Sequence, residues 1–100
     1  MTEEAKHKNK FRQSAKWKKF RQWLKKERKI DPITGSRLVA RCQCHHCCML
    51  DSEYENLNPD NFEMLNPTTH KVIHFLFETR DWRRALEEIK RILEKMERLN

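Results

Sequence analysis

Four of the five histidines in this chain form one spaced set with an asparagine, and this set constrains the fold more than any other feature. His45 and His46 are adjacent, Asn61 follows fifteen residues after His46, His70 nine residues later, and His74 four residues later again. Imidazole is a common ligand of divalent transition metals and also a good base near neutral pH. The spacing therefore predicts a metal site with a base beside it.

The size of the chain limits it to a single small domain. A chain of 100 residues, 37% of them hydrophobic, has a core small enough that a metal or a partner often adds stability. We expect a disordered basic tail over residues 1–9 and one domain over 10–100. No apolar run approaches the roughly 18 residues that span a bilayer, and the first residues lack the apolar stretch of a signal peptide. The expected location is the cytoplasm, with no membrane partner.

Apolar side chains at helical intervals predict a helix at each end of the chain. Over residues 10–30 they alternate with lysines and arginines, so the N-terminal helix is amphipathic and basic. It should end at the turn Asp31–Gly35, because Pro32 fixes φ and the only glycine of the chain follows. The C-terminal helix should begin after the cap Asp81 and carry a continuous apolar stripe from Trp82 to Leu99.

The middle of the chain predicts two strands followed by a helix. Residues 38–49 are expected to form a strand or hairpin arm, 51–60 a polar loop and 61–65 a short second strand. Asn66 is a good N-cap and Pro67 suits the first helical position, so a helix should run from there to about Glu78. His70 and His74 would then lie on one face of that helix. The fold class is α+β.

This arrangement resembles the HNH endonuclease family, whose core is the ββα-metal finger, and is closest to its small bacteriophage members. The likeness covers about residues 38–77, chiefly an asparagine, an apolar strand and two histidines four residues apart. The leading helix and the Asp31-Pro32-Ile33-Thr34-Gly35 turn add to it. The resemblance implies a ββα-metal finger flanked by the two amphipathic helices. If a phage encodes the chain, the expected location is the cytoplasm of the host cell.

The resemblance also implies a role for each residue of the set. His45, His70 and His74 would bind one divalent metal, His46 would be the general base that activates water, and Asn61 would orient that base. Three imidazoles favour Zn²⁺, Ni²⁺, Co²⁺ or Mn²⁺, although the family leaves Mg²⁺ open. Consecutive strand residues point to opposite faces, so both His45 and His46 can enter one site only if the strand is bulged, twisted or ending there.

The distribution of charge predicts a nucleic-acid partner. Residues 1–41 contain fourteen Lys or Arg against four Asp or Glu, whereas the remainder has eight against eleven. A basic half suits a polyanion such as DNA, although a solvated basic helix is the simpler alternative. The residues expected to contact phosphates are Lys16, Lys18, Lys19, Lys26 and Arg41.

Two functions from different classes remain open. The first is metal-dependent hydrolysis of DNA, and the second is a metal-stabilised module that binds nucleic acid or a host protein without cutting it. A purely structural finger needs ligands but neither a base nor its orienting residue, so the presence of His46 and Asn61 favours the enzyme. A monomer, with the basic helix covering the C-terminal stripe, is favoured over a homodimer.

Four clustered cysteines depart from the family pattern, in which two separated Cys-x-x-Cys pairs often hold a structural zinc. Cys42, Cys44, Cys47 and Cys48 all lie within seven residues, too close for a closed Cys₄ site. We expect reduced, buried cysteines that pack as small apolar residues, with Cys47 as a weaker candidate for a metal ligand.

Overall fold

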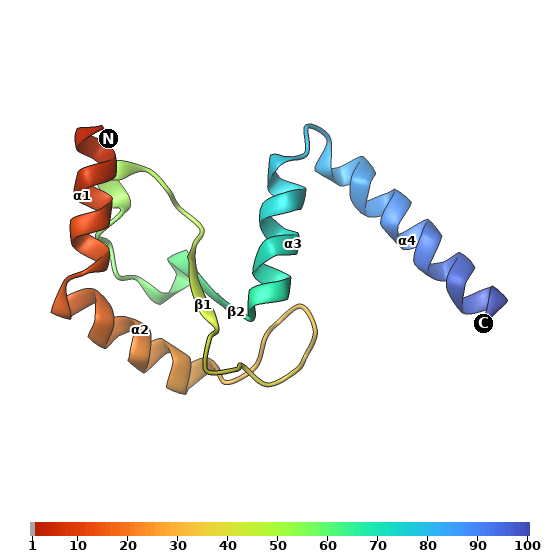
Figure 1. The fold of residues 1–100 in the computed structure, drawn as a ribbon, viewed down its shortest axis with the longest axis horizontal. Helices are drawn as coiled ribbons and strands as arrows, with labels where there is room; N and C mark the ends of the chain where they lie inside the picture. Colours follow the sequence, from red (N-terminus) through yellow and green to blue (C-terminus); the bar gives the residue numbers. More distant parts are fainter. Residues whose placement is uncertain (1) are drawn as a thin grey trace. The chain divides into compact units, whose positions relative to one another are not determined.

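The computed structural model describes residues 2–100, which form helices and one two-stranded antiparallel sheet, so the predicted α+β class is confirmed (Figure 1). The elements are α1 (Glu3–Arg12), α2 (Ala15–Arg28), β1 (Gln43–His46), β2 (Phe62–Leu65), α3 (Pro67–Glu78) and α4 (Trp82–Leu99), with single 3-10 turns at Asp51–Glu53 and Pro59–Asn61. Within residues 2–100, every helix is too short or too polar to cross a bilayer. The chain divides between Pro67 and Thr68 into two compact units.

The N-terminal region contains two helices where the sequence predicted a frayed tail and one helix over residues 10–30. Thr2 caps α1 by accepting a hydrogen bond from the Ala5 backbone N–H, and the acidic side chains of Glu3 and Glu4 lie in the first turn. Negative charge is favourable there because the N-terminal end of a helix carries a partial positive charge. Ser14 caps α2 in the same way, accepting from Trp17 N–H, and so separates the two helices. The expected tail over residues 1–9 and the expected single helix over residues 10–30 were both wrong, because the capping residues Thr2 and Ser14 were not recognised in the sequence.

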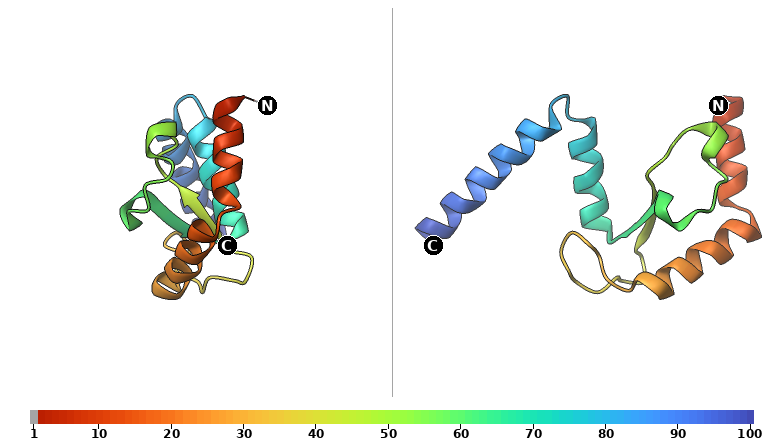
Figure 2. Two further views of the ribbon diagram at one scale, coloured as in Figure 1. Left: turned by 90° about the vertical axis from the view of Figure 1, so that its left-hand side faces the viewer. Right: turned by 180° about the vertical axis from the view of Figure 1, so that it is seen from behind.

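Aromatic side chains dominate the core of the first unit. Trp17 of α2 lies between Phe11 of α1 and Phe62 of β2, with ring centroids 5.8 and 5.6 Å away. Tyr54 completes this group from the loop between the strands, which runs beside α1 (Figure 2). The other buried members of the cluster are Leu24, Cys42 and Met64. The apolar face of α2 is thus used to cover the small sheet.

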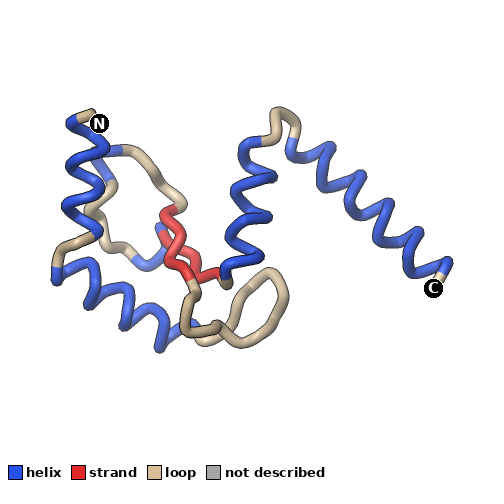
Figure 3. The backbone as a smooth tube through the Cα atoms, in the orientation of Figure 1, coloured by secondary structure: helices blue, strands red, loops and turns tan. Residues whose placement is uncertain are grey.

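Arginine side chains hold the long loops of this unit by donating to neutral oxygen atoms. Arg12 donates to the Tyr54 hydroxyl, Arg21 to the Cys42 carbonyl, and Arg28 to the carbonyls of Phe62 and Pro59. The sheet of the described residues has two short strands, and long loops connect it to the helices (Figure 3). The guanidinium groups supply donors to these oxygen atoms and so tie the loops to α1 and α2.

The predicted turn at Asp31–Gly35 is present and is tied to a distant part of the chain. Its backbone closes through Gly35 N–H to the Asp31 carbonyl at 2.8 Å, and Gly35 has φ +71°. The fully buried carboxylate of Asp31 accepts from the backbone N–H groups of Ile33, Thr34 and Asn66. The Asn66 side chain in turn donates to the Arg37 carbonyl and accepts from Val39 N–H. Asp31 and Asn66 thus brace the loop against the end of β2.

The strands are shorter than predicted, whereas both C-terminal helices begin and end where the sequence placed them. Only Gln43–His46 of residues 38–49 pairs with β2, in a register that sets His45 opposite Glu63 and His46 opposite Phe62. Asn61 ends a 3-10 turn, so β2 begins one residue later than expected. Asp81 caps α4 by accepting from Arg84 N–H.

The apolar stripe of α4 is exposed. None of its residues is buried, and the side chains are exposed by 36% to 73%. The stripe comprises Trp82, Leu86, Ile89, Ile92, Leu93, Met96 and Leu99. The apolar face of the N-terminal basic helix, which was expected to cover this stripe, packs in the core of the first unit.

Candidate metal centre

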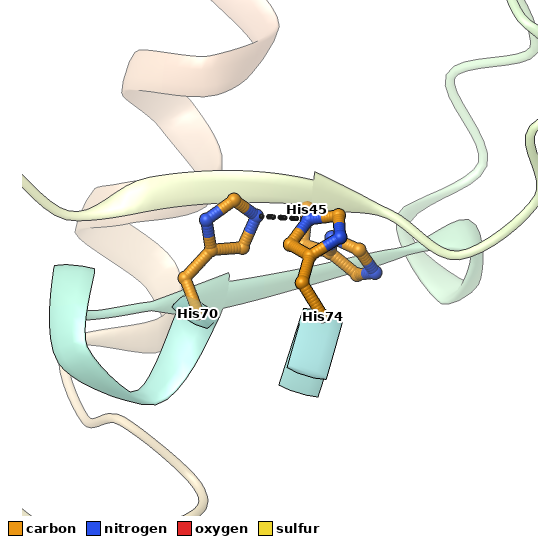
Figure 4. Close-up of side chains that lie close together, drawn as sticks. All are labelled: His45, His70 and His74. Carbon is orange, nitrogen blue, oxygen red and sulfur yellow. Dashed lines mark hydrogen bonds between the residues drawn. The ribbon is translucent and has the colours of Figure 1, made fainter. Parts of the chain in front are cut away.

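The three histidines predicted as metal ligands cluster. His45 lies on β1, His70 and His74 lie one turn apart on α3, and one nitrogen from each falls within 4.8 Å of the others (Figure 4). The Nε2 atoms of His70 and His74 are 3.0 Å apart, and their rings meet edge to face. His45 and His70 are half-buried and His74 is exposed. The cluster is a possible binding site for a metal ion.

The donor set suits a borderline transition metal. In a tetrahedral zinc site with Zn–N bonds of about 2.0–2.1 Å, ligand nitrogens lie about 3.3 Å apart. The spacings here, 3.0 Å for one pair and at most 4.8 Å for the others, bracket that value, so small side-chain rotations suffice. Three protein ligands also leave a fourth position for water or substrate, as in catalytic zinc sites. The absence of carboxylates from the cluster makes it a poor match for Mg²⁺, which prefers oxygen ligands.

His46 is not part of this cluster and lies in the aromatic core. Its ring stacks on Tyr54 at 4.2 Å with 4° between the planes, stacks on Trp17 at 4.9 Å, and meets Phe62 edge-on. It is 8% exposed. Adjacent strand residues point to opposite faces, and no bulge in β1 brings the two imidazoles together. The expected position of His46, beside the metal as a general base, therefore differs from its observed position.

Burial determines the proton chemistry of His46. Removal from water lowers its pKa to about 4, despite a backbone hydrogen bond to Tyr54 that raises it. Nε2 is buried and has no hydrogen-bond partner among residues 2–100, so the bond to Tyr54 involves Nδ1. The ring is accordingly neutral at pH 7 and carries its proton on Nδ1. Its basic nitrogen, Nε2, is covered by the surrounding rings.

Asn61 contacts β1 through its backbone and does not hold the His46 ring. Its carbonyl accepts from Cys47 N–H at 2.8 Å, which extends the pairing of the strands by one residue. The group that fixes the ring is the Tyr54 backbone, and Tyr54 also covers one of its faces. Sequence reasoning missed Tyr54 because it lies in a polar stretch. The only signal was that the one tyrosine of the chain occurs there.

The cysteines are free thiols, and the histidine cluster includes none of them. Cys42 is buried in the core, as expected, whereas Cys47 is exposed, contrary to expectation. Burial raises the pKa of Cys44 to about 12 and also raises that of Cys47. A raised pKa disfavours the thiolate, which is the form that binds metals.

The basic residues expected to contact DNA are all exposed and none of them supports the fold. No hydrogen bond or ion pair to any described residue is made by the side chains of Lys16, Lys18, Lys19, Lys26 and Arg41. Their charges therefore remain available to a polyanion. Most of the neighbouring arginines, by contrast, donate to protein oxygens.

Comparisons with protein families, with curated proteins and with solved structures found no match.

Proposed function

We propose that this chain is a metal-dependent endonuclease of the HNH type that hydrolyses phosphodiester bonds in DNA. The observation that carries the proposal is the cluster of His45, His70 and His74, the three residues that the resemblance implies as ligands. The order β1, β2, α3 is compatible with a ββα-metal finger. The unengaged lysines of α2 supply a surface for phosphates.

The three imidazoles would hold one divalent metal, with Zn²⁺, Ni²⁺, Co²⁺ or Mn²⁺ favoured by the donor set. Bound there, such an ion would stabilise the charge that develops on the phosphoryl oxygens and the leaving alkoxide. The fold would position the metal through these side chains. His45 comes from β1, and His70 and His74 lie on one face of α3.

His46 is the proposed base, and two features of its surroundings support that role. The bond to Tyr54 fixes the proton on Nδ1, which leaves Nε2 with the lone pair that accepts a proton from water. The stacked rings fix the orientation of the imidazole. Water reaches Nε2 only after Trp17 or Tyr54 moves, and His46 points to the face of β1 opposite His45. The proposal therefore requires both a side-chain movement and a local change in β1 when DNA binds.

The second candidate is a metal-stabilised module that binds DNA or a host protein without cutting it. The burial of His46 favours this candidate, because an aromatic stack around an imidazole also serves purely as packing. In that case the histidine cluster would supply stability, as structural zinc sites do.

Substitution of His46 by an aromatic residue separates the two candidates. His46→Phe keeps the stacking but removes the base, whereas His46→Ala also leaves a cavity. Cleavage of supercoiled and linear plasmid DNA would be followed with each divalent metal and with a chelator. We expect the wild type to cut, and His46→Phe to stay folded, bind metal normally and lose cleavage.

Metal binding needs its own control. His70→Ala should lose Zn²⁺ binding in calorimetry together with activity, whereas His7→Gln, at the only histidine outside the set, should keep both. Metal and DNA binding by the wild type without cleavage under any condition would favour the binding module. Undiminished cleavage by His46→Phe would remove His46 from the mechanism.

A further inference from the structure

The exposed face of α4 has the spacing of a helix that pairs with another helix. With Ile89 taken as position a of a heptad, the a and d positions are Trp82, Ala85, Ile89, Ile92, Met96 and Leu99. Leu86 and Leu93 fall at position e and widen this seam on one side. Apolar a and d positions over about two and a half heptads are typical of a short helix that packs along another helix.

The helix also needs a partner for physical reasons. It has 18 residues, only a little more than the roughly 12–15 below which isolated helices are marginal in water. Most helices in proteins gain their stability from packing of the apolar face. Here that face remains exposed, and a shallow groove lined by Leu86, Ile89, Leu93 and Met96, among others, runs along it.

We propose that α4 pairs with α4 of a second copy of this chain, in antiparallel orientation about a two-fold axis. In the register that sets Ile89 against Ile92 of the second copy, Ala85 meets Met96 and Trp82 meets Leu99. A small residue thus lies opposite a long flexible one, and the largest residue lies at the end of the seam, where there is room. Each layer occurs twice, as a two-fold interface requires.

Charge complementarity selects the antiparallel orientation. Glu88 and Lys95 occupy position g, and in the antiparallel pair Glu88 lies beside Lys95 of the second copy, on both sides of the axis. On the opposite edge, Leu86 and Leu93 of the two copies face one another and extend the apolar seam. In a parallel pair, position g faces position e, so Glu88 would lie against Leu93 and would have no oppositely charged partner on the second helix, although it keeps its ion pair with Arg91 of its own helix. Self-complementarity of size and charge therefore identifies a second copy as the occupant.

Sedimentation of the full chain between 1 and 100 µM tests the proposal. We expect a dimer near 25 kDa, twice the 12.3 kDa chain, that dissociates on dilution. Ile89→Glu places a charge in the central layer and removes an apolar side chain from each copy's seam, so it should raise the dimer Kd by about 100-fold or more. The substitution lies on an exposed face, and circular dichroism of the first unit's aromatic bands verifies that the core remains folded.

A charge exchange tests the orientation. Glu88→Lys and Lys95→Glu each bring like charges together at two places and should weaken the dimer by about tenfold. The double variant should restore wild-type affinity, which a parallel pair does not predict. Glu87→Lys, at the outer position f, makes the same change in net charge and should leave the dimer unaffected.

Three results would overturn the proposal. If the chain remains a 12.3 kDa monomer at 100 µM, α4 does not form a dimer, and the apolar stripe must bind something else, such as a lipid surface or the rest of the same chain. A dimer insensitive to Ile89→Glu uses a different surface. A dimer that the double exchange fails to restore is not the antiparallel pair. None of these results bears on metal binding or cleavage, so the inference stands or falls apart from the proposed function.

Discussion

Replacement of the buried carboxylate of Asp31 should destabilise the first unit by an amount that the structure allows us to estimate. The carboxylate is fully buried and accepts from the N–H groups of Ile33 at 2.8 Å, Asn66 at 2.9 Å and Thr34 at 3.3 Å. Asp31→Asn keeps the shape and one acceptor oxygen, which can still serve Ile33 and Thr34. Its new NH₂ group faces the Asn66 N–H, so two donors meet where a charge-assisted bond existed.

Hydrogen bonds to charged groups contribute about 1.5–3 kcal/mol each, and a buried donor without a partner costs a similar amount. We therefore expect Asp31→Asn to lose about 2–3 kcal/mol of unfolding free energy, and Asp31→Ala about 4 kcal/mol, because all three donors then lack a partner. With a urea m-value of about 1–2 kcal/mol/M, the midpoint for Asp31→Asn should fall by roughly 1–3 M.

Urea titrations followed by circular dichroism at pH 7 provide the measurement. Asp60→Asn is the matched control, because Asp60 is exposed and its carboxylate makes no hydrogen bond to any described residue, so its midpoint should not change. A loss below about 0.5 kcal/mol for Asp31→Asn, the range of ordinary surface substitutions, would refute the brace between the turn and Asn66.

Three further predictions concern charge and metal. Reversal of charge at Lys16, Lys18, Lys19 and Lys26 should reduce the steepness with which DNA affinity falls with salt, by up to about 0.9 in the log–log slope for each phosphate that is no longer neutralised; an unchanged slope places the DNA elsewhere. Hydrogen bonds to Asp51 and then Glu55 raise the pKa of His7 above 6.5, so its contribution to stability is complete below pH 6.5 and is lost as the pH rises through the raised value. Thermal melts of wild type and His7→Gln from pH 5 to 9 should therefore converge at high pH, and parallel curves would exclude the contribution. Zn²⁺ at 100 times its Kd should stabilise the chain by about 2.7 kcal/mol, and His45→Ala should abolish the resulting rise in Tm.

The parts of the fold that were predicted correctly depend on local signals. A cap, a proline at the first helical position and a regular apolar period lie within one segment, so the bounds of α3 and α4 followed from the sequence. Ser14 is also a local signal, but an apolar period continuing across it concealed the break between α1 and α2. The shared helix face of His70 and His74 followed from their spacing, and the addition of His45 to the cluster was expected from the family resemblance.

The parts that were missed depend on contacts between residues far apart in the chain. Asp31 and Asn66 are 35 residues apart, and the sequence does not show that a side chain in one turn accepts from the end of a distant strand. Tyr54 lies in a polar loop and becomes core only because α1 and α2 leave space beside His46. Strand alternation did indicate that His45 and His46 face opposite ways, and the observed strand follows that rule.

The arginine contacts with neutral oxygens have a consequence for handling the protein at different ionic strengths. Arg12, Arg21 and Arg28 donate to a hydroxyl and to carbonyls, which are dipoles that added salt screens much less than it screens pairs of exposed charges. At the same salt concentrations a polyanion dissociates from surface lysines, because the counterions released on binding are then abundant in solution. A high-salt wash should therefore strip bound nucleic acid from the purified protein while the first unit stays folded, and dialysis should return a competent sample without a refolding step.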